Sequence, residues 1–381
     1  MGFEVEIVKY APPGNGLGYY KGKAVFVPAA AVGDVVRVFT LKEKKRFIIA
    51  GIETVVSPSA ERIEAACPHY NVCGGCSLMH LPYKKQIDLK QQMMADVFNG
   101  ASLQINPDIL PCQRDQQFRY RSQLKCSNGF VGYSEKHRHH VFEVTECLIL
   151  AQGIQKTLPV LKRLGRMHCE FRLLESSLNG DVSLTVSENG LSNPVPGFPQ
   201  LIKEDYGFGE IELNSDSFSQ SNPLTTRSII EDLLAASEDC ESACELYCGS
   251  GTFSIPLAKK MNRLVGFDVD PKAIETAKKN AERHDLNHAT FNKANLEKNV
   301  EIPSVDMILV DPPRKGLSQT ALSKIGRSGA SKLLYVSCDP ATLARDASIL
   351  IKDYRFNIDF IRGYDMYCHS THLEALATFI R

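Results

Sequence analysis

The sequence predicts a chain of several domains, in which a small N-terminal β-barrel of the OB type and a mainly β central region precede a C-terminal α/β domain with a doubly wound sheet. Three observations predict this fold class. The chain has 381 residues, which is more than one ordinary hydrophobic core holds. Residues 3–56 carry short strand patterns without a helical period. From Ser215 onward, strand and helix patterns alternate, as they do in a parallel sheet covered by helices.

Composition limits the class of protein. Hydrophobic residues make up 43% of the chain and charged residues 23%, which is typical of a soluble globular protein. Because no apolar run approaches about 18 residues and no signal peptide opens the chain, we expect a cytoplasmic protein without membrane contact. Lysine plus arginine equal aspartate plus glutamate at 44 each, so a nucleic-acid partner requires a local basic patch. The 12 cysteines favour metal ligands or catalytic thiols over disulfides in that compartment.

The N-terminal region, 1–59, reads as the barrel. Strand patterns at 3–8, 23–27, 34–38 and 46–52 are separated by turn residues at 12–16 and 32–33. So many short strands in so few residues are typical of a small barrel, and such barrels often bind nucleic acid. A basic run on one connection comprises Lys42, Lys44, Lys45 and Arg46. This run is either an RNA-binding surface or a solvated hairpin tip.

A cysteine-rich loop follows the barrel. Cys67, Cys73 and Cys76 have the spacing C-x5-C-x2-C, and the proline and glycines between them bend the loop so that three sulfurs can converge. We choose Cys147 as the fourth ligand among the remaining cysteines. Four thiolates suit either zinc or an iron-sulfur cluster, and the spacing does not separate the two. Unligated structural thiols are the third interpretation.

The segment between the barrel and the α/β domain is predicted in two parts. Residues 83–98 have a helical period, and we expect the helical segment 82–105 to pack on the C-terminal domain. Residues 60–81 and 106–213 then form the central domain, which is mainly β. Cations interleaved with aromatic residues give a second candidate RNA surface, with a solvated hairpin as the alternative. Its basic residues are Arg119, Arg121, Lys125 and the run 136–140.

The α/β domain, 214–381, opens with a nucleotide-type motif. A strand pattern ends at Tyr247, and Gly249 and Gly251 then let the backbone approach a ligand at the start of a helix. Asp268 ends the next strand, where an acid commonly holds ribose hydroxyls. This arrangement fits NAD and S-adenosylmethionine (SAM). The absence of the third glycine of the dinucleotide fingerprint favours SAM.

Three further residues stand at strand ends. Asp311 follows the fourth strand, and Cys338 follows the next strand and precedes Pro340. Because ligands bind at this edge of a parallel sheet, Cys338 is a candidate thiolate nucleophile. Glu374 opens the final strand and can face Cys338 across the crevice. The alternatives are that Cys338 is a small buried apolar residue and that Glu374 is an ordinary surface charge.

Six segments, in this order, resemble the SAM-dependent RNA uracil-5-methyltransferase family: 217–222, 246–251, 295–297, 311–314, 337–340 and 372–374. The resemblance covers nearly the whole chain and implies a Rossmann-like methyltransferase domain. It also implies that the barrel is a TRAM domain and that the four cysteines hold a 4Fe-4S cluster, with zinc less favoured. This combination resembles the members that act on 23S ribosomal RNA more than those that act on transfer RNA. We expect a monomer.

The resemblance also implies roles for individual residues. Cys338 is the expected nucleophile and Glu374 the expected general base. The expected cofactor residues are Gln220, Tyr247, Gly249, Gly251, Thr252, Asp268, Asn295 and Asp311. Thr252 and Asp268 stand where relatives usually carry Asn and Glu, and the shorter acid can still reach a ribose. Asp339 stands in place of the usual Asn beside the nucleophile, and it raises the thiol pKa unless it points away.

The chemistry that these residues imply is covalent. Cys338 adds to C6 of uracil, C5 then attacks the methyl group of SAM, and Glu374 removes the C5 proton before elimination. The target base has to leave its stack to reach the crevice. One rival is radical-SAM chemistry, which needs an iron left open by three cysteines, usually in a different spacing. The other rival is a non-catalytic RNA-binding protein.

Overall fold

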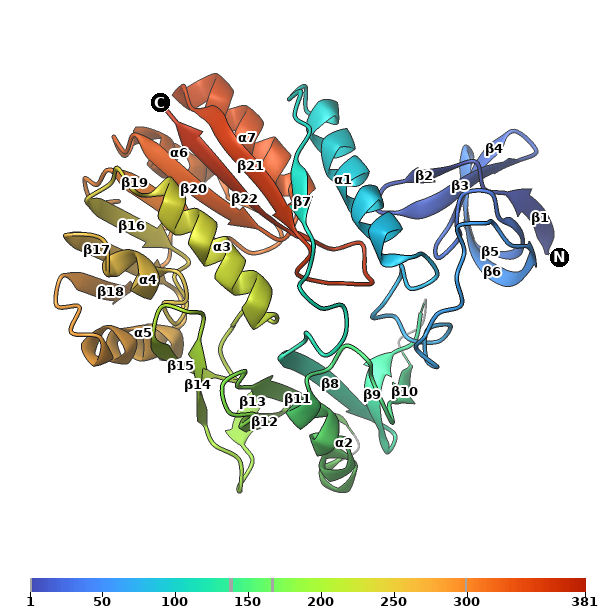
Figure 1. The fold of residues 1–381 in the computed structure, drawn as a ribbon, viewed down its shortest axis with the longest axis horizontal. Coiled ribbons are helices and arrows are strands. Elements are labelled where there is room, and N and C mark those ends of the chain that lie inside the picture. The colour runs from blue at the N-terminus through green and yellow to red at the C-terminus, as the bar shows by residue number, and fades with distance from the viewer. Residues whose placement is uncertain (1, 137–139, 166–167, 299) are drawn as a thin grey trace.

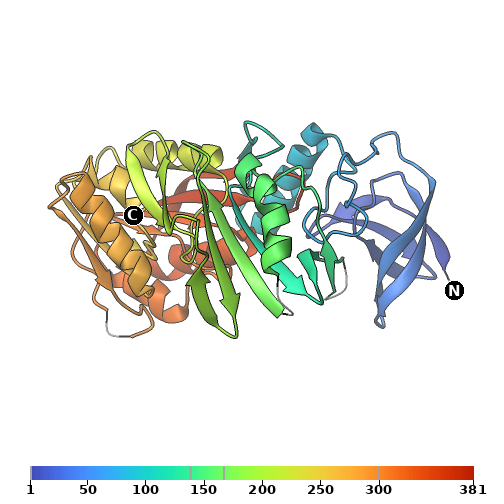
Figure 2. The same cartoon turned by 90° about the horizontal axis from the view of Figure 1, so that it is seen from below.

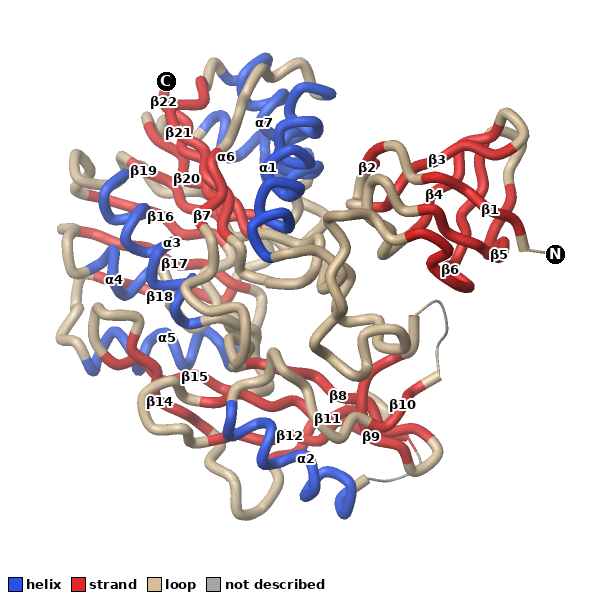
Figure 3. Tube along the Cα trace, turned by 45° about the vertical axis from the view of Figure 1, so that its right-hand side comes forward, coloured by secondary structure: helices blue, strands red, loops and turns tan. Residues whose placement is uncertain are grey.

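The computed structural model describes residues 2–136, 140–165, 168–298 and 300–381. In these ranges the strands form an N-terminal six-stranded sheet, a central six-stranded sheet, a two-stranded sheet and an eight-stranded sheet. The N-terminal sheet lies at one end of the long axis of the molecule, as Figures 1 and 2 show from two sides. The segment that joins it to the rest, residues 58–82, is a long connection without helix or strand (Figure 3).

The N-terminal sheet has the strand order β1-β5-β6-β4-β3-β2. Its strands are β1 (Phe3–Glu6), β2 (Lys9–Ala11), β3 (Asn15–Tyr20), β4 (Lys23–Val27), β5 (Val35–Glu43) and β6 (Phe47–Ser57). The sheet curls around a core of valines and isoleucines that includes Val25 and Val36. A Cβ on Gly18 of β3 would lie 2.2 Å from the carbonyl oxygen of Glu6, so only glycine lets β3 approach the end of β1 this closely. The sequence prediction missed β2 and β3, because glycines interrupt the apolar pattern of β3.

The central sheet is antiparallel, with the order β10-β9-β8-β11-β12-β13. Its strands are β8 (Arg121–Ser127), β9 (Phe130–Ser134), β10 (Val141–Glu143), β11 (His168–Glu175), β12 (Val182–Glu188) and β13 (Leu191–Pro194). Helix α2 (Gln152–Leu164) covers one face, where Ile154 and Leu158 pack on Leu124 and Phe171. The turns at 128–129 and 189–190 are Asn-Gly pairs with positive φ at both residues, the geometry that a tight hairpin requires.

The eight-stranded sheet has the order β18-β17-β16-β19-β20-β22-β21-β7. Its strands are β7 (Asp108–Leu110), β16 (Ser242–Leu246), β17 (Arg263–Asp268), β18 (Ala289–Lys293), β19 (Met307–Val310), β20 (Lys332–Ser337), β21 (Asn357–Tyr364) and β22 (Glu374–Ile380). Strands β16 to β20 run parallel to one another, whereas β22 runs antiparallel to both β20 and β21. The carboxyl ends of the parallel strands therefore share one edge with the start of β22.

Helices cover both faces of this sheet, so the fold is the expected three-layer arrangement (Figure 1). One core packs against α3 (Pro223–Ala236), α4 (Ser254–Ala258) and α5 (Pro271–Arg283). The other core packs against α1 (Tyr83–Gly100), α6 (Gln319–Arg327) and α7 (Pro340–Tyr354). Ser318 caps α6 and Asp270 caps α5 through their side chains, which fixes the helix starts just beyond the sheet edge.

The predicted central segment 106–213 differs from the structure at both ends. Strand β7 pairs in parallel with β21 and so joins the eight-stranded sheet. At the other end, the hairpin of β14 (Leu201–Asp205) and β15 (Glu210–Asn214) places Ile202 and Ile211 in the core beneath α3. The sequence could not show either partner, because a strand of three residues has no measurable period and a hairpin pattern does not reveal what its apolar face covers.

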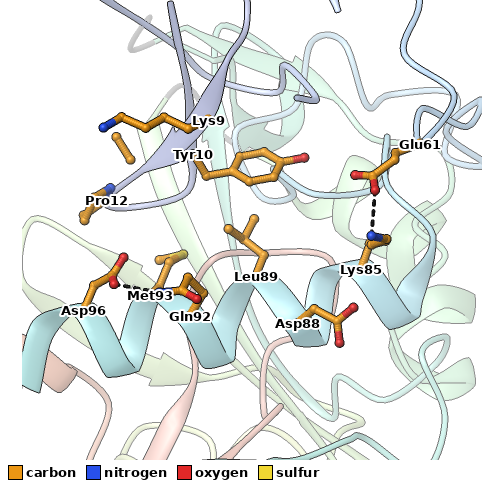
Figure 4. A pocket seen from close by; sticks show the side chains of 11 residues that line it. Lys9, Tyr10, Pro12, Glu61, Lys85, Asp88, Leu89, Gln92, Met93 and Asp96 are labelled. Carbon is orange, nitrogen blue, oxygen red and sulfur yellow. Dashed lines mark hydrogen bonds and ion pairs between the residues drawn. The ribbon is translucent and has the colours of Figure 1, made fainter. Parts of the chain in front are cut away.

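Helix α1 lies between the N-terminal sheet and the eight-stranded sheet. Its residues Met94 and Phe98 enter the core beside α7. A cavity of about 390 Å³ separates its opposite face from β2, with Leu89 and Met93 on the helix side (Figure 4). The ion pair between Lys85 and Glu61, 2.6 Å long, closes one end of this cavity. Helix α1 therefore links two parts of the protein that are distant in the fold.

In the part of the chain that the structure describes, no helix is both long enough and apolar enough to cross a membrane.

Candidate active site and cysteine cavity

The loop after β16 forms the first part of the candidate site. Tyr247, Gly249 and Gly251 have positive φ angles of 67°, 53° and 88°, which turn the chain sharply before α4. A Cβ on Gly249 would meet nothing within 4 Å, so the backbone is open to a ligand at this point. The amide N–H of Gly249 donates to Asp268 Oδ2 at 2.9 Å, and that of Asp270 donates to Asp268 Oδ1 at 2.8 Å. The Asp268 carboxylate is thus held beside the glycine loop.

Gln220 and Asp311 meet at the same edge of the sheet. The Gln220 amide donates to Asp311 Oδ2 at 3.1 Å. Among the described residues, Gln220 Oε1 and the hydroxyls of Ser221 and Ser250 are buried without a hydrogen-bond partner. Such atoms are costly to leave unpaired, so they point to a ligand that completes their bonding. Burial raises the pKa of Asp311, and the charge of Asp268 raises it further, while the bond from Gln220 lowers it.

The other predicted cofactor residues lie along this edge. Thr252 is half-buried in the turn before α4, and Asn295 is exposed just after β18. The Asn295 side chain accepts a hydrogen bond from the amide of Glu297 at 3.0 Å, which holds the turn. Because β16, β17 and β18 are parallel neighbours, the residues that follow them gather at one end of the sheet. This arrangement suits SAM, which has ribose hydroxyls, an amino group and a carboxylate to be bound.

The structure brings Cys338 and Glu374 together. Strands β20 and β22 pair antiparallel down to Ser337 opposite Ala375, and the same register places Cys338 opposite Glu374 one step further. Glu374 is 2% exposed. Cys338 is half-buried. Thus a thiol and a carboxyl group lie side by side at the edge that also carries Asp311.

The electrostatics of this pair are unusual. Burial raises the pKa of the Cys338 thiol to about 11, and the carboxylates of Glu374 and Asp311 act in the same direction, whereas Arg314 opposes them. Burial and Asp311 also hold the pKa of Glu374 well above its ordinary value, again against Arg314. Strongly perturbed groups in a cleft are typical of functional sites. The surroundings therefore favour the neutral form of both groups.

Asp339, the acid beside the nucleophile, points away from it. Its Oδ1 accepts hydrogen bonds from the amides of Ala341 at 2.9 Å and Thr342 at 3.1 Å, so it caps the start of α7. The concern that Asp339 adds a negative charge next to the thiol is resolved by this cap, because the carboxylate is directed to the helix.

Arg121 joins the central sheet to the catalytic edge. Its guanidinium donates to the carbonyl of Ser217 and to the hydroxyl of Ser219 at 3.0 Å. Burial and the nearby charges of Arg172 and Arg119 lower its pKa to about 10. Arg121 is therefore a structural link, and in this respect it differs from the free surface cation that the sequence suggested.

Phe218 and Lys125 bear on the second predicted RNA surface, whose role stays a prediction. Phe218 is 65% exposed, and the Arg121 guanidinium lies 5.8 Å from its ring centroid. Lys125 is exposed on β8. Of the predicted basic run 136–140, residues 137–139 lie outside the described residues. The run at 42–46 occupies the exposed tip of the β5–β6 hairpin, and its RNA-binding role stays a prediction.

The four predicted metal-ligand cysteines line one cavity of about 470 Å³. Cys67, Cys73, Cys76 and Cys147 are all free thiols, and burial together with the other three sulfurs raises the pKa of Cys76 to about 12. Among the described residues, no group of three or more His, Cys, Asp or Glu is arranged around a single metal ion. The choice between zinc and an iron-sulfur cluster at these cysteines stays a prediction.

The sequence analysis did not predict one buried ion pair, which involves helix α1. Lys90 of α1 forms an ion pair with Asp365, and both side chains are fully buried. A signal was present, because Lys90 lies four residues after Gln86 and four before Met94, on the face of α1 that is buried. A lysine on a buried helical face requires an anionic partner. The sequence pattern did not identify the partner, Asp365, which is 275 residues away in the sequence.

The fold and the site together define a class of protein. A doubly wound sheet with a glycine loop, an acid after the second strand and an open crevice is the class I methyltransferase fold. The crystal structure of the tRNA (uracil-54, C5)-methyltransferase of Pyrococcus abyssi has this fold, with a TM-score of 0.81, 23% sequence identity and coverage of 99% of this chain and 100% of that chain. The expected fold class is thereby confirmed at the level of a multidomain methyltransferase fold with mixed sheets.

Sequence comparison finds similar proteins. Residues 209–380 match the tRNA (uracil-5-)-methyltransferase family. The 23S rRNA (uracil(1939)-C(5))-methyltransferase of Vibrio parahaemolyticus is 29% identical over 98% of this chain and 95% of that protein. The enzyme of the same name from Alkalilimnicola ehrlichii is 29% identical over 100% of this chain and 96% of its own length. The chain is thus similar to RNA uracil-5-methyltransferases, and its enzyme class is that of SAM-dependent RNA uracil-5-methyltransferases.

Proposed function

We propose that this enzyme methylates C5 of a specific uridine in 23S ribosomal RNA through a covalent adduct between Cys338 and C6 of the base. The observation that carries the proposal is the strand register that sets Cys338 opposite Glu374 beside Asp311. The choice of RNA is supported by the two relatives named for 23S rRNA, which align with almost the whole chain. Transfer RNA is the second candidate, because the matching family and the Pyrococcus abyssi enzyme are named for it.

The proposed role of Cys338 is addition to the base. When bound, SAM supplies an electrophilic methyl group. Uracil C5 is too weak a nucleophile to accept it, so Cys338 gives its proton to water, and its sulfur forms a bond with C6 while the electron pair of the C5–C6 double bond moves through C5 to the C4 oxygen. C5 of this enolate then forms the bond to the methyl group, and S-adenosylhomocysteine leaves with the electron pair of the broken sulfur–methyl bond. The high pKa of Cys338 keeps the thiol neutral until substrate and cofactor enter the crevice. This prevents the free enzyme from reacting with other electrophiles.

The proposed role of Glu374 follows methyl transfer. Its carboxylate takes the proton from C5, the electron pair re-forms the C5–C6 double bond, and the bond from C6 to the Cys338 sulfur breaks. The raised pKa of Glu374 suits a base that accepts a proton from carbon near neutral pH. Arg314 lowers this pKa and so favours the ionised form that the step requires.

We propose that the cofactor lies along the edge formed by the loops after β16, β17, β18 and β19. Asp268 is placed to accept from ribose hydroxyls, and Gln220 Oε1 is an acceptor without a partner of its own. The full set of proposed cofactor residues is Gln220, Tyr247, Gly249, Gly251, Thr252, Asp268, Asn295 and Asp311. Equilibrium dialysis with S-adenosylhomocysteine tests the set, because Asp268→Ala should weaken binding at least ~10-fold if two ribose bonds are lost.

We also propose that Cys67, Cys73, Cys76 and Cys147 hold a 4Fe-4S cluster, because all four thiols line one cavity. Four protein ligands leave no iron open, which disfavours radical-SAM chemistry. Anaerobically purified protein should contain about four iron atoms per chain, and Cys73→Ser should lose iron and the visible absorbance together. Binding of one zinc ion without iron would overturn the assignment.

The remaining assignments concern the other parts of the chain. We propose that residues 1–59 form a TRAM-like barrel and that it binds RNA together with the central sheet, next to the catalytic domain at 214–381. The exposed basic hairpin tip at residues 42–46 supports this role. We further propose that the enzyme acts as a monomer. Sedimentation with and without an RNA fragment tests both proposals.

Covalent trapping tests the reaction. RNA transcripts that contain 5-fluorouridine should form an adduct with the enzyme that survives denaturing electrophoresis, only when SAM is present, because fluorine at C5 blocks proton removal. Cys338→Ala should abolish the adduct, while Cys126→Ala, a buried cysteine of the central core, should retain it. A non-catalytic RNA-binding protein would form no adduct. Transcripts of 23S rRNA and of transfer RNA, tested in parallel, decide between the two candidate substrates.

A further inference from the structure

The segment from Asp365 to Leu373, here called the base loop, connects β21 to Glu374 at the start of β22. It forms neither helix nor strand, so its backbone polar groups need partners from elsewhere in the protein. The base loop determines the position of Glu374, because Glu374 is the first residue of β22 and follows the loop directly. Whatever holds the base loop therefore sets the position of the proposed base.

Lys90 of α1 holds the base loop at its start, middle and end. Its ammonium group forms the ion pair with Asp365 and donates to the carbonyl oxygens of Tyr367 at 3.1 Å and His372 at 2.8 Å. These three bonds use all three N–H donors of a lysine. His372 is only two residues before Glu374, so the third bond fixes the entry into β22. Tyr83 supports the arrangement, because its hydroxyl donates to Asp365 Oδ2 at 2.7 Å.

A second set of contacts fixes the centre of the base loop at His369. Gln86, one turn before Lys90 on α1, accepts from the His369 amide at 3.1 Å. The amides of Ser77 and Leu78, which follow Cys76, both donate to the His369 carbonyl at 2.8 Å. The base loop is thus held by α1 and by the end of the cysteine loop, and the ion pair at its start is fully buried.

We propose that Lys90 is a positioning residue of the methyl-transfer reaction, which holds the base loop so that Glu374 meets the C5 proton of the adduct. This inference rests on the proposed function of Glu374. A buried ion pair is a poor way to gain stability, because apolar residues of similar volume stabilise a core equally well. Its value here is geometric, since one ammonium group fixes three points of an irregular loop. Lys90 touches neither substrate nor cofactor and acts through Glu374.

The proposal predicts a specific kinetic defect. A displaced Glu374 leaves addition and methyl transfer possible but slows proton removal, and a misplacement of about 1 Å costs roughly 10²-fold. Lys90→Met should therefore accumulate a covalent adduct on ordinary uridine RNA with SAM, where the unsubstituted enzyme accumulates none. Binding of S-adenosylhomocysteine should remain within about twofold. Lys84→Met, an exposed position on the same helix, is the matched control and should turn over normally.

Lys90→Met leaves Asp365 buried without its partner and can fail to fold, so a second variant removes both charges. Lys90→Met with Asp365→Asn should fold and show the same adduct on ordinary RNA. If this folded double variant turns over normally, or loses adduct formation and turnover in equal proportion, Lys90 has only a structural role. Failure of the proposed function is a separate result, because the unsubstituted enzyme would then form no Cys338-dependent adduct with 5-fluorouridine RNA.

Discussion

Two buried carboxyl groups stand at the two ends of the base loop, and their surroundings are opposite. Asp365 is fully buried, but it is paired with Lys90 and accepts a hydrogen bond from Tyr83. Glu374 is 2% exposed, and it faces Asp311, a second acid, beside the Cys338 thiol. The first carboxylate is fully compensated, so it holds structure. The second is held in an unfavourable state, which is the state that chemistry can use.

The largest expected effect comes from the uncompensated group. Glu374→Gln should lower turnover by roughly 10²-fold to 10⁴-fold, because an amide cannot accept the C5 proton. The covalent adduct should accumulate on ordinary RNA. The free energy of unfolding should change little, since burial and Asp311 raise the pKa of Glu374 and so favour a neutral group of nearly the same shape as the amide. Release of 5-methyluridine and a denaturing gel measure the first two effects.

The matched control is Asp359→Asn, an exposed carboxylate on β21, which should leave turnover unchanged. Normal turnover by Glu374→Gln would remove Glu374 from the mechanism.

Asp365, the carboxylate that is paired with Lys90, should behave in the opposite way, because its replacement should have a large effect on stability. Asp365→Asn leaves the ammonium group of Lys90 buried without a countercharge. Removing one partner of a buried ion pair costs about 3–5 kcal/mol, so the urea midpoint should fall markedly. Urea unfolding followed by circular dichroism measures this loss, with Glu374→Gln as the comparison. A loss below about 1 kcal/mol would show that the two carboxyl groups do not differ in the way the structure indicates.

A third prediction uses the thiol as a reporter of the uncompensated group. Cys338 should react with iodoacetamide with a midpoint near pH 11, because burial and the two carboxylates favour the neutral thiol. Glu374→Gln removes one of these negative charges, so the midpoint should move to lower pH. Peptide mass spectrometry separates Cys338 from the other cysteines. A midpoint that stays in place or rises would mean that Glu374 does not act on the thiol.

The sequence was sufficient to predict the group of residues around Glu374. Asp311, Cys338 and Glu374 each follow or open a strand with a strong apolar pattern, and the rule that parallel strands share one carboxyl edge brings such residues together. The three-layer fold could be predicted for the same reason, because long alternating patterns specify both the element and its buried face. The rule on parallel strands also explains why the predicted cofactor residues lie along one edge of the sheet.

The other side of the comparison depends on pairings that no local pattern encodes. Lys90 and Asp365 are 275 residues apart, and their contact arises only when α1 docks beside the base loop. Strand β7 is likewise too short for its sequence to indicate that it pairs with β21. The role of Asp339 was also open in the sequence, since the same carboxylate can face the thiol or cap the following helix, and only the backbone geometry at the helix start decides.

Asp339 gives the smallest expected effect, and it sharpens the comparison with a third carboxylate near the nucleophile. Because its carboxylate caps α7, Asp339→Asn should preserve the cap and leave both the unfolding free energy and the alkylation midpoint of Cys338 nearly unchanged. Asp339→Ala should cost about 1 kcal/mol, the usual loss for a helix cap, again without moving the midpoint. A fall in the midpoint for Asp339→Asn, similar to that for Glu374→Gln, would show that Asp339 faces the thiol. Proximity in the sequence would then outweigh the helix cap, and the distinction between compensated and uncompensated carboxylates would not hold beside Cys338.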